Sequence, residues 1–108
     1  MNEQFDDERR FHKLGHRMKQ ERAIAIALEA LTFLAGDPER LEAFMANTGL
    51  SSVDLTERTE EPDLLVSVLD AVLADETTVM LFAAERQVEP EMVYPARLTL
   101  GGTYDVSI

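Results

Sequence analysis

Few side chains in this sequence have types and spacing that could support chemistry. His12 and His16 are four residues apart, which on a helix would place both imidazoles on one side, as in some zinc sites. No third ligand is evident nearby, Gly15 weakens a helix there, and Lys13 and Arg17 would repel a cation. We therefore predict no metal site and no bound cofactor.

Two pairs of adjacent carboxylates, Asp75-Glu76 and Glu60-Glu61, are the other candidates for chemistry. Such pairs can act in acid–base catalysis when burial raises the pKa of one member. Both pairs stand where helices are expected to begin, and acids at helix starts cap backbone N–H groups and oppose the helix dipole favourably. We expect capping, and we keep as the alternative function a small-molecule-binding protein or minor enzyme that uses these helix-start carboxylates.

Nucleophilic catalysis and phosphate binding find little support. The chain has no Cys, and neither His has a Ser and a carboxylate in a recognisable arrangement. Gly101-Gly102 lacks the helix and the Lys that follow in a phosphate-binding loop. The sequence predicts no catalytic residues and a protein that is not an enzyme.

Residues 41–55 have the spacing of a helix-turn-helix, with Gly49 at the turn. The small residue usual four positions before the glycine is Met45 here. The second helix and the residues after it, 51–63, carry five acidic residues against Arg58 alone, so this element would be repelled by phosphates. We predict a structural corner and no nucleic-acid binding.

The charge is strongly negative and unevenly distributed. Ten basic and 21 acidic residues give a net charge of −11; residues 1–22 are close to neutral at +1, and residues 23–108 carry −12. Such a body repels nucleic acids and anionic lipids and favours a basic partner, although a solvated surface explains the charge equally well.

These side chains would be positioned by helices organised around residues 23–35, which contain one charge, Glu29. At 100° per residue, two apolar faces are nearly opposite, one centred on Leu28 and Leu31 and the other on Ile26 and Phe33. The pattern predicts a central helix, about residues 20–35, that is covered on two sides.

Capping signals divide the rest of the chain into further helices. Asp37 and Pro38 begin the second, and Gly49 ends it in a left-handed conformation. Ser51 or Ser52 caps a short third helix, and if Ser51 is the cap, Asp54 forms a capping box with it. A fourth begins near Pro62, and Asp75 favours a break and a fifth helix, although a single helix over 62–86 stays open.

A sixth helix is expected from Pro90 toward Leu100, with a kink at Pro95 because proline lacks the N–H that the carbonyl of Glu91 would accept. The sequence thus predicts an all-α bundle of five or six short helices. We expect a mobile tail over 1–17, one helical domain over 18–102 and a loose end over 103–108.

The N-terminus is polar, unlike a signal segment, and the longest apolar stretch is too short to span a membrane. We therefore expect a cytoplasmic protein with no membrane partner. Large apolar side chains at helical spacing are mostly core residues, but some could line a groove for a partner helix or a second copy. As possible partner contacts we select Phe44, Met80, Phe82 and Tyr94.

An ordered series of motifs also suggests a family: Phe33-Leu34-Ala35, Asp37-Pro38-Glu39-Arg40-Leu41, Thr48-Gly49-Leu50, Val68-Leu69-Asp70, Leu73-Ala74-Asp75-Glu76, Phe82-Ala83, Pro90-Glu91 and Gly101-Gly102. On these residues the chain resembles the short bacterial proteins of domain-of-unknown-function family 3572, over about three quarters of its length. Pro95 is a local departure from the pattern. The resemblance implies an all-helical domain with no assigned activity and transfers no functional residues.

The function that these observations favour is a small non-catalytic protein-interaction or regulatory module. Its partner would be a basic protein surface or an identical subunit.

Overall fold

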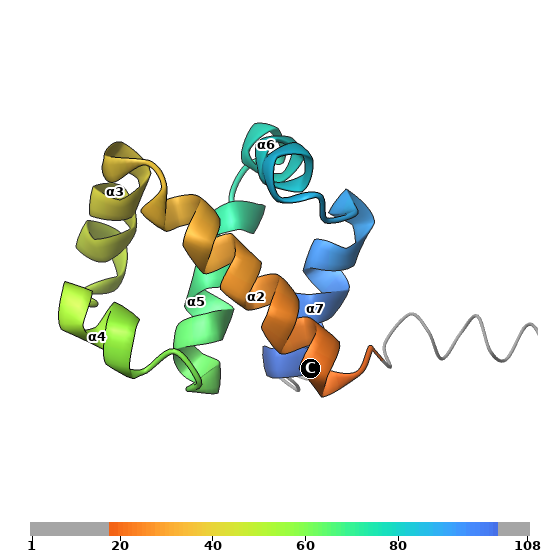
Figure 1. The fold of residues 1–108 in the computed structure, drawn as a ribbon, viewed down its shortest axis with the longest axis horizontal. Helices are drawn as coiled ribbons and strands as arrows, with labels where there is room; N and C mark the ends of the chain where they lie inside the picture. The colour runs from red at the N-terminus through yellow and green to blue at the C-terminus, as the bar shows by residue number, and fades with distance from the viewer. Residues whose placement is uncertain (1–17, 102–108) are drawn as a thin grey trace, which may run out of the picture.

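The computed structural model describes residues 18–101, which form six α-helices and one short 3-10 helix (Figure 1). The elements are α2 (Gln20–Ala35), α3 (Pro38–Thr48), α4 (Ser52–Glu57), α5 (Pro62–Leu73), α6 (Glu76–Arg86), η1 (Pro90–Met92) and α7 (Val93–Gly101). The predicted all-α fold is confirmed, with the predicted central helix at α2. The tail expected over 1–17 and the end expected over 103–108 lie outside the described residues.

Side chains cap the starts of α3, α4 and α6, and a glycine ends α3. The backbone N–H of Glu39 donates to the Asp37 carboxylate at 3.0 Å, and Gly49 ends α3 with φ of +79°. At α4 the N–H of Asp54 donates to the Ser51 hydroxyl at 3.1 Å, while the N–H of Ser51 donates to the Asp54 carboxylate at 2.9 Å. The predicted caps and the capping box are confirmed, because each depends on residues close together in the sequence.

The favoured break at Asp75 is also confirmed. The Asp75 side chain accepts hydrogen bonds from the backbone N–H of Thr77 at 3.2 Å and from the hydroxyl of Thr78 at 2.6 Å. These bonds start α6, and two residues, Ala74 and Asp75, separate it from the end of α5. Residues 62–86 therefore form two helices.

The kink expected at Pro95 does not occur. The chain forms the 3-10 turn η1 first, and the α-helix starts at Val93, so Pro95 is the third residue of α7. The first N–H groups of an α-helix have no partner within the helix, so proline loses no hydrogen bond at this position. The chain therefore changes from a 3-10 helix to an α-helix at Val93, before it reaches Pro95.

Helix α2 crosses diagonally over α5 (Figure 1) and packs against α3, α5, α6 and α7. The buried core contains most of one face of α2 and the apolar stripe of α5, together with one residue each from α3, α4 and α6 and two from α7. Its largest fully buried side chains are Phe33, Phe82, Leu64, Leu65, Leu69, Val68, Val72 and Val93.

The two-sided cover expected of α2 is met only in part: on the face that includes Leu28 and Leu31, Ala27 and Leu34 are buried, while Ile24 and Leu31 are half-buried against the core. The buried residues of the helix are Ala23, Ile26, Ala27, Ala30, Phe33 and Leu34. On the partly covered face Leu28 is 37% exposed and Ala35 is exposed. Thus an apolar strip along α2 stays partly exposed to solvent.

Two ion pairs join helices that are distant in the sequence. Arg86 Nε of α6 lies 2.8 Å from Glu29 Oε1 of α2, and Arg97 Nε of α7 lies 2.8 Å from Asp70 Oδ1 of α5. Both carboxylates are exposed enough for solvent to weaken the pairs, so packing carries most of the stability. Within the described helices, none has both the length and the hydrophobicity needed to cross a bilayer.

Candidate protein-interaction surfaces

The structure separates the four predicted contact residues into two groups. Phe44 and Phe82 are 3% and 0% exposed, so they belong to the core and are not available to a partner in this fold. The Phe82 ring meets Phe33 of α2 edge to face, with ring centroids 5.5 Å apart. Met80 and Tyr94 are 51% and 53% exposed and can contact a partner.

Met80 belongs to an exposed apolar stripe of α6, which we call the α6 ridge and which consists of Thr77, Met80, Leu81 and Ala84. A shallow depression of about 390 Å³ lies against Thr77, Met80 and Leu81. These four residues are spaced so that their side chains lie on one side of the helix. Sequence reasoning identified Met80 but not Leu81, its exposed neighbour.

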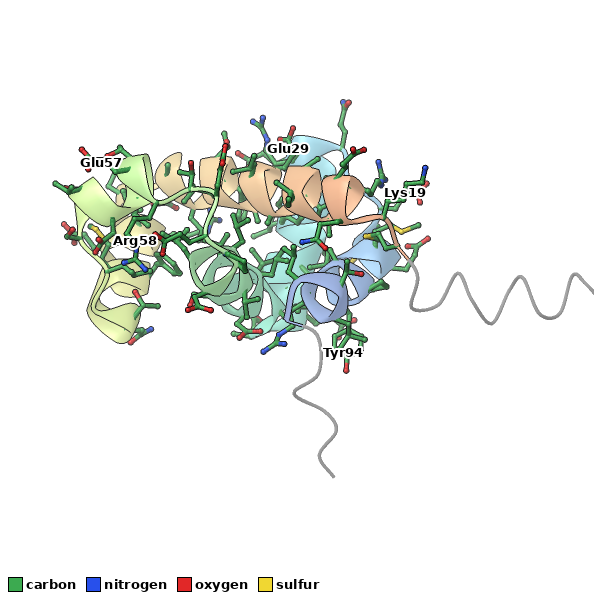
Figure 2. All side chains as sticks on the ribbon, turned by 90° about the horizontal axis from the view of Figure 1, so that it is seen from below. Lys19, Glu29, Glu57, Arg58 and Tyr94 are labelled. Atoms are coloured by element: carbon green, nitrogen blue, oxygen red, sulfur yellow. The ribbon has the colours of Figure 1, made fainter. Side chains whose placement is uncertain are left out.

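Tyr94 lies on the opposite side of the molecule from α2. Figure 2 shows its side chain beyond α7, whereas Glu29 and Glu57 lie on the same side as α2. A partner that contacts the exposed side of α2 or α4 would therefore not reach Tyr94.

A groove between α2, α3 and α4 forms an apolar hollow, which sequence reasoning did not find. Its volume is about 340 Å³. We call it the α2–α4 groove, and its lining residues are Leu31, Thr32, Ala35, Leu41, Ser52, Leu55 and Thr56. The available signal was the second apolar face of α2, which had been assigned to the core.

The threonine hydroxyls of the groove bond to their own helices. Thr32 donates to the carbonyl oxygen of Leu28 at 3.0 Å, and Thr56 donates to the carbonyl oxygen of Val53 at 3.0 Å. Because both hydroxyl protons are used, these residues offer a ligand little hydrogen-bonding capacity as donors. The groove is suited to apolar side chains.

The surface around the groove is acidic. Residues 18–101 contain six basic and 16 acidic residues, a net charge of −10. Arg58, which follows α4, lies 2.8 Å from Glu61 and 3.3 Å from Asp54. The backbone N–H of Ser51 and the Arg58 guanidinium lower the pKa of Asp54, so this carboxylate stays ionised and holds Arg58 in place. Glu57 is exposed (Figure 2).

Asp75 caps α6 as expected, but the capping expected of Glu60-Glu61 is wrong, because Glu61 precedes α5 without a side-chain capping hydrogen bond. Asp75 is exposed, and the Thr78 hydroxyl that donates to it lowers its pKa. A general acid at neutral pH requires the opposite shift. Glu61 of the second pair accepts from Arg58, and Glu60 beside it is exposed.

Residues 18–101 bring no three metal-ligating side chains together. His12 and His16 lie outside this part of the chain. The helix-turn-helix spacing corresponds to α3 and α4, but α4 is only six residues long. The corner that these helices form contributes the groove.

Comparison with known proteins gives one match. The model of the family described as "Protein of unknown function (DUF3572)" matches residues 20–103. Neither the curated proteins nor the solved structures gave a significant match. The matched residues include all seven elements of the fold.

Proposed function

The chain belongs to the DUF3572 family of proteins of unknown function, and we propose that it is a small non-catalytic protein-interaction or regulatory module. In this proposal the helical body holds apolar contact surfaces in place for a partner protein. The proposal includes the cytoplasm as its location.

The observation that carries the proposal is the α2–α4 groove, an apolar hollow in an otherwise acidic surface. Contiguous apolar surface on a small protein is typical of interaction sites. The α6 ridge is a second such surface, and its Met80 belongs to a residue type common at adaptable interfaces. Exposed Val53 on α4 and Leu28 on α2 add to the apolar surface of two of the three helices that border the groove.

Charge favours a different protein over a second copy. A homodimer would bring together two bodies that each carry −10 over residues 18–101. A partner with a basic surface would instead be attracted. The alternative, a small-molecule-binding protein or minor enzyme using helix-start carboxylates, gains no support from Asp75, whose pKa is lowered by the Thr78 hydroxyl.

The test is in-cell crosslinking and mass spectrometry in the native cell, with three forms of the full chain. These are the unmodified protein, a groove variant with Thr56→Arg, and a ridge variant with Met80→Glu and Leu81→Glu. A protein that the unmodified chain captures and that one of the two variants loses would support an interaction module.

Two outcomes would overturn the proposal. One is an identical set of captured proteins for all three forms. The other is a metabolite that raises the melting temperature of the chain and is chemically converted during incubation with it. Size-exclusion chromatography with light scattering identifies a homodimer independently.

A further inference from the structure

We propose that the α2–α4 groove binds an amphipathic helix of a partner protein, with apolar side chains in the groove and Lys or Arg side chains beside them. This inference rests on the proposed function and specifies the chemistry of the partner. It assigns the contact to α2 and α4 and not to the α6 ridge.

The shape of the apolar surface favours a helix. The open strip of α2 continues from the groove through residues spaced three or four apart, Ile24, Leu28, Leu31 and Ala35. It therefore extends about 17 Å along the helix, the length of about three turns. A helix that docks in a groove presents anchors with this same spacing.

The lining favours apolar anchors. Leu31, Leu41 and Leu55 line the groove from three different helices, and the hydroxyls of Thr32 and Thr56 are bonded to their own helices. A polar side chain placed there would lose its water without gaining strong hydrogen-bond partners. An apolar side chain gains from burial instead.

The charges favour basic flanks. The segment 57–63, which follows the groove residue Thr56, contains Glu57, Glu60, Glu61 and Asp63. Its only cation, Arg58, is held by Glu61 and by Asp54. A partner helix with Lys or Arg beside its anchors would therefore be attracted, and an acidic helix would be repelled.

The chain itself contains a segment of this chemistry, because residues 9–14 include three basic residues with Phe11 and Leu14. From Gln20 to Leu31, α2 rises about 17 Å, and the seven residues from Phe11 to Met18 reach at most about 24 Å when fully extended. Only a nearly extended chain could bring Phe11 to Leu31, and in such a chain residues three apart no longer share a face. The geometry thus points to a separate helix.

The experiment selects ligands from a phage-displayed library of random peptides, about 16 residues long, on the full chain. The ligands are then mapped by chemical-shift changes in the ¹⁵N-labelled protein. We expect enrichment of Leu, Ile, Phe or Met at helical spacing with Lys and Arg between them, and shifts centred on Leu31, Thr32, Leu55 and Thr56.

Matched variants test the site. Thr56→Arg and Thr32→Arg, which place bulk and positive charge in the groove, should each weaken binding at least tenfold. Thr77→Arg makes the same charge change on the α6 ridge and should alter binding less than twofold. Unchanged melting temperatures will show that the variants are folded. Because Thr32 and Thr56 lie on different helices, the site can still be tested if one of the two groove variants does not fold.

Several results would overturn the inference. They are a library that yields no ligand, ligands without basic residues, and shifts centred on the α6 ridge; the last would leave the proposed function standing. A synthetic peptide of residues 3–17 that competes with the selected ligands at equal affinity would identify the chain's own segment as the occupant. Failure of the proposed function is recognised separately, by the crosslinking experiment.

Discussion

Gly49 and Gln87 both end helices with left-handed backbone conformations, with φ of +79° and +58°. Glycine adopts this conformation at little cost, whereas other residues are strained there. The chain therefore uses a favourable residue after α3 and an unfavourable one after α6. The sequence indicated the first position and gave no signal for the second.

We expect Gly49→Ala to lower the free energy of unfolding by about 1 kcal/mol. A Cβ atom there would contact nothing within 4 Å, so the loss would come from the backbone conformation alone. Urea denaturation measures the effect. Gly36→Ala is the matched control, because Gly36 has φ of −77° and room for a Cβ atom; equal losses in the two variants would contradict the explanation.

The converse change, Gln87→Gly, should raise the free energy of unfolding by about 0.5–1 kcal/mol, because it removes the strain of a left-handed glutamine. The same urea titration applies. A loss of stability would show that contacts of the Gln87 side chain outweigh the strain.

Asp75 should make stability depend on pH. The hydrogen bond from Thr78 lowers its pKa below the ordinary value of 3.8 in the folded state, so its contribution is complete above that value and is lost as the pH falls through the folded pKa. Asp75→Asn keeps a capping oxygen but does not titrate. Between about pH 6 and pH 3, the unmodified protein should lose more unfolding free energy than Asp75→Asn.

Urea titrations across this pH range provide the measurement. Thr78→Val removes the hydroxyl that lowers the Asp75 pKa, so it should reduce the pH dependence in the same direction. Parallel pH profiles for the unmodified protein and Asp75→Asn would show that the Asp75 pKa is equal in the folded and unfolded states.

At the scale of elements, the contact between α2 and α6 explains why Phe82 is a core residue. Phe82 packs against Phe33, and the guanidinium of Arg40 lies 4.3 Å from the Phe33 ring centroid. Three helices therefore meet around one aromatic pair. The apolar residues of α6 did not show whether Phe82 would be buried, because the adjacent apolar residue Leu81 is exposed.

Phe82→Ala should cost about 3–5 kcal/mol of unfolding free energy, because it removes a fully buried ring. Met80→Ala, two residues earlier on the exposed ridge, should change it by less than about 0.5 kcal/mol. Thermal and urea unfolding measure both variants, and Phe82→Leu should give a smaller loss if Phe82→Ala does not fold. Similar costs at Met80 and Phe82 would contradict the assignment of Phe82 to the core.

Helix α4 is the least integrated element. It has six residues, and Leu55 is its buried anchor. Its capping box forms locally, so a short helix persists without extensive packing. Because α4 does not close against α2, the α2–α4 groove remains open between them.

At the scale of the whole molecule, negative charge dominates. Four arginines of the described part pair with carboxylates, yet the net charge over 18–101 remains −10. Repulsion among the other carboxylates opposes the folded state and favours a basic partner.

Raising NaCl from about 0.01 M to about 0.15 M should increase the free energy of unfolding, because the screening length falls from about 30 Å to about 8 Å. Urea titrations at the two salt concentrations measure the change, and choline chloride serves as a control for specific sodium binding. A decrease would mean that the ion pairs contribute more than the repulsion costs.

The sequence by itself determined the all-helical class, the boundaries at Asp37, Gly49, Ser51 and Asp75, and the charge. Each cap involves residues within three positions of each other, so local sequence is sufficient. Composition fixes the charge without any fold. The kink expected at Pro95 was wrong, because the effect of a proline depends on where the α-helix starts, and no local signal marked the start at Val93.

Only the tertiary structure decided which apolar residues are covered. Leu28 and Phe33 belong to the same helix with the same periodicity, but Phe33 is buried because α6 brings Phe82 against it, 49 positions along the chain. Leu28 and Leu31 were expected to be covered as well, yet Leu28 is exposed and Leu31 is only half-buried. Periodicity locates a face on a helix, but the neighbour that buries it comes from distant sequence, and so the groove could be seen only in the folded chain.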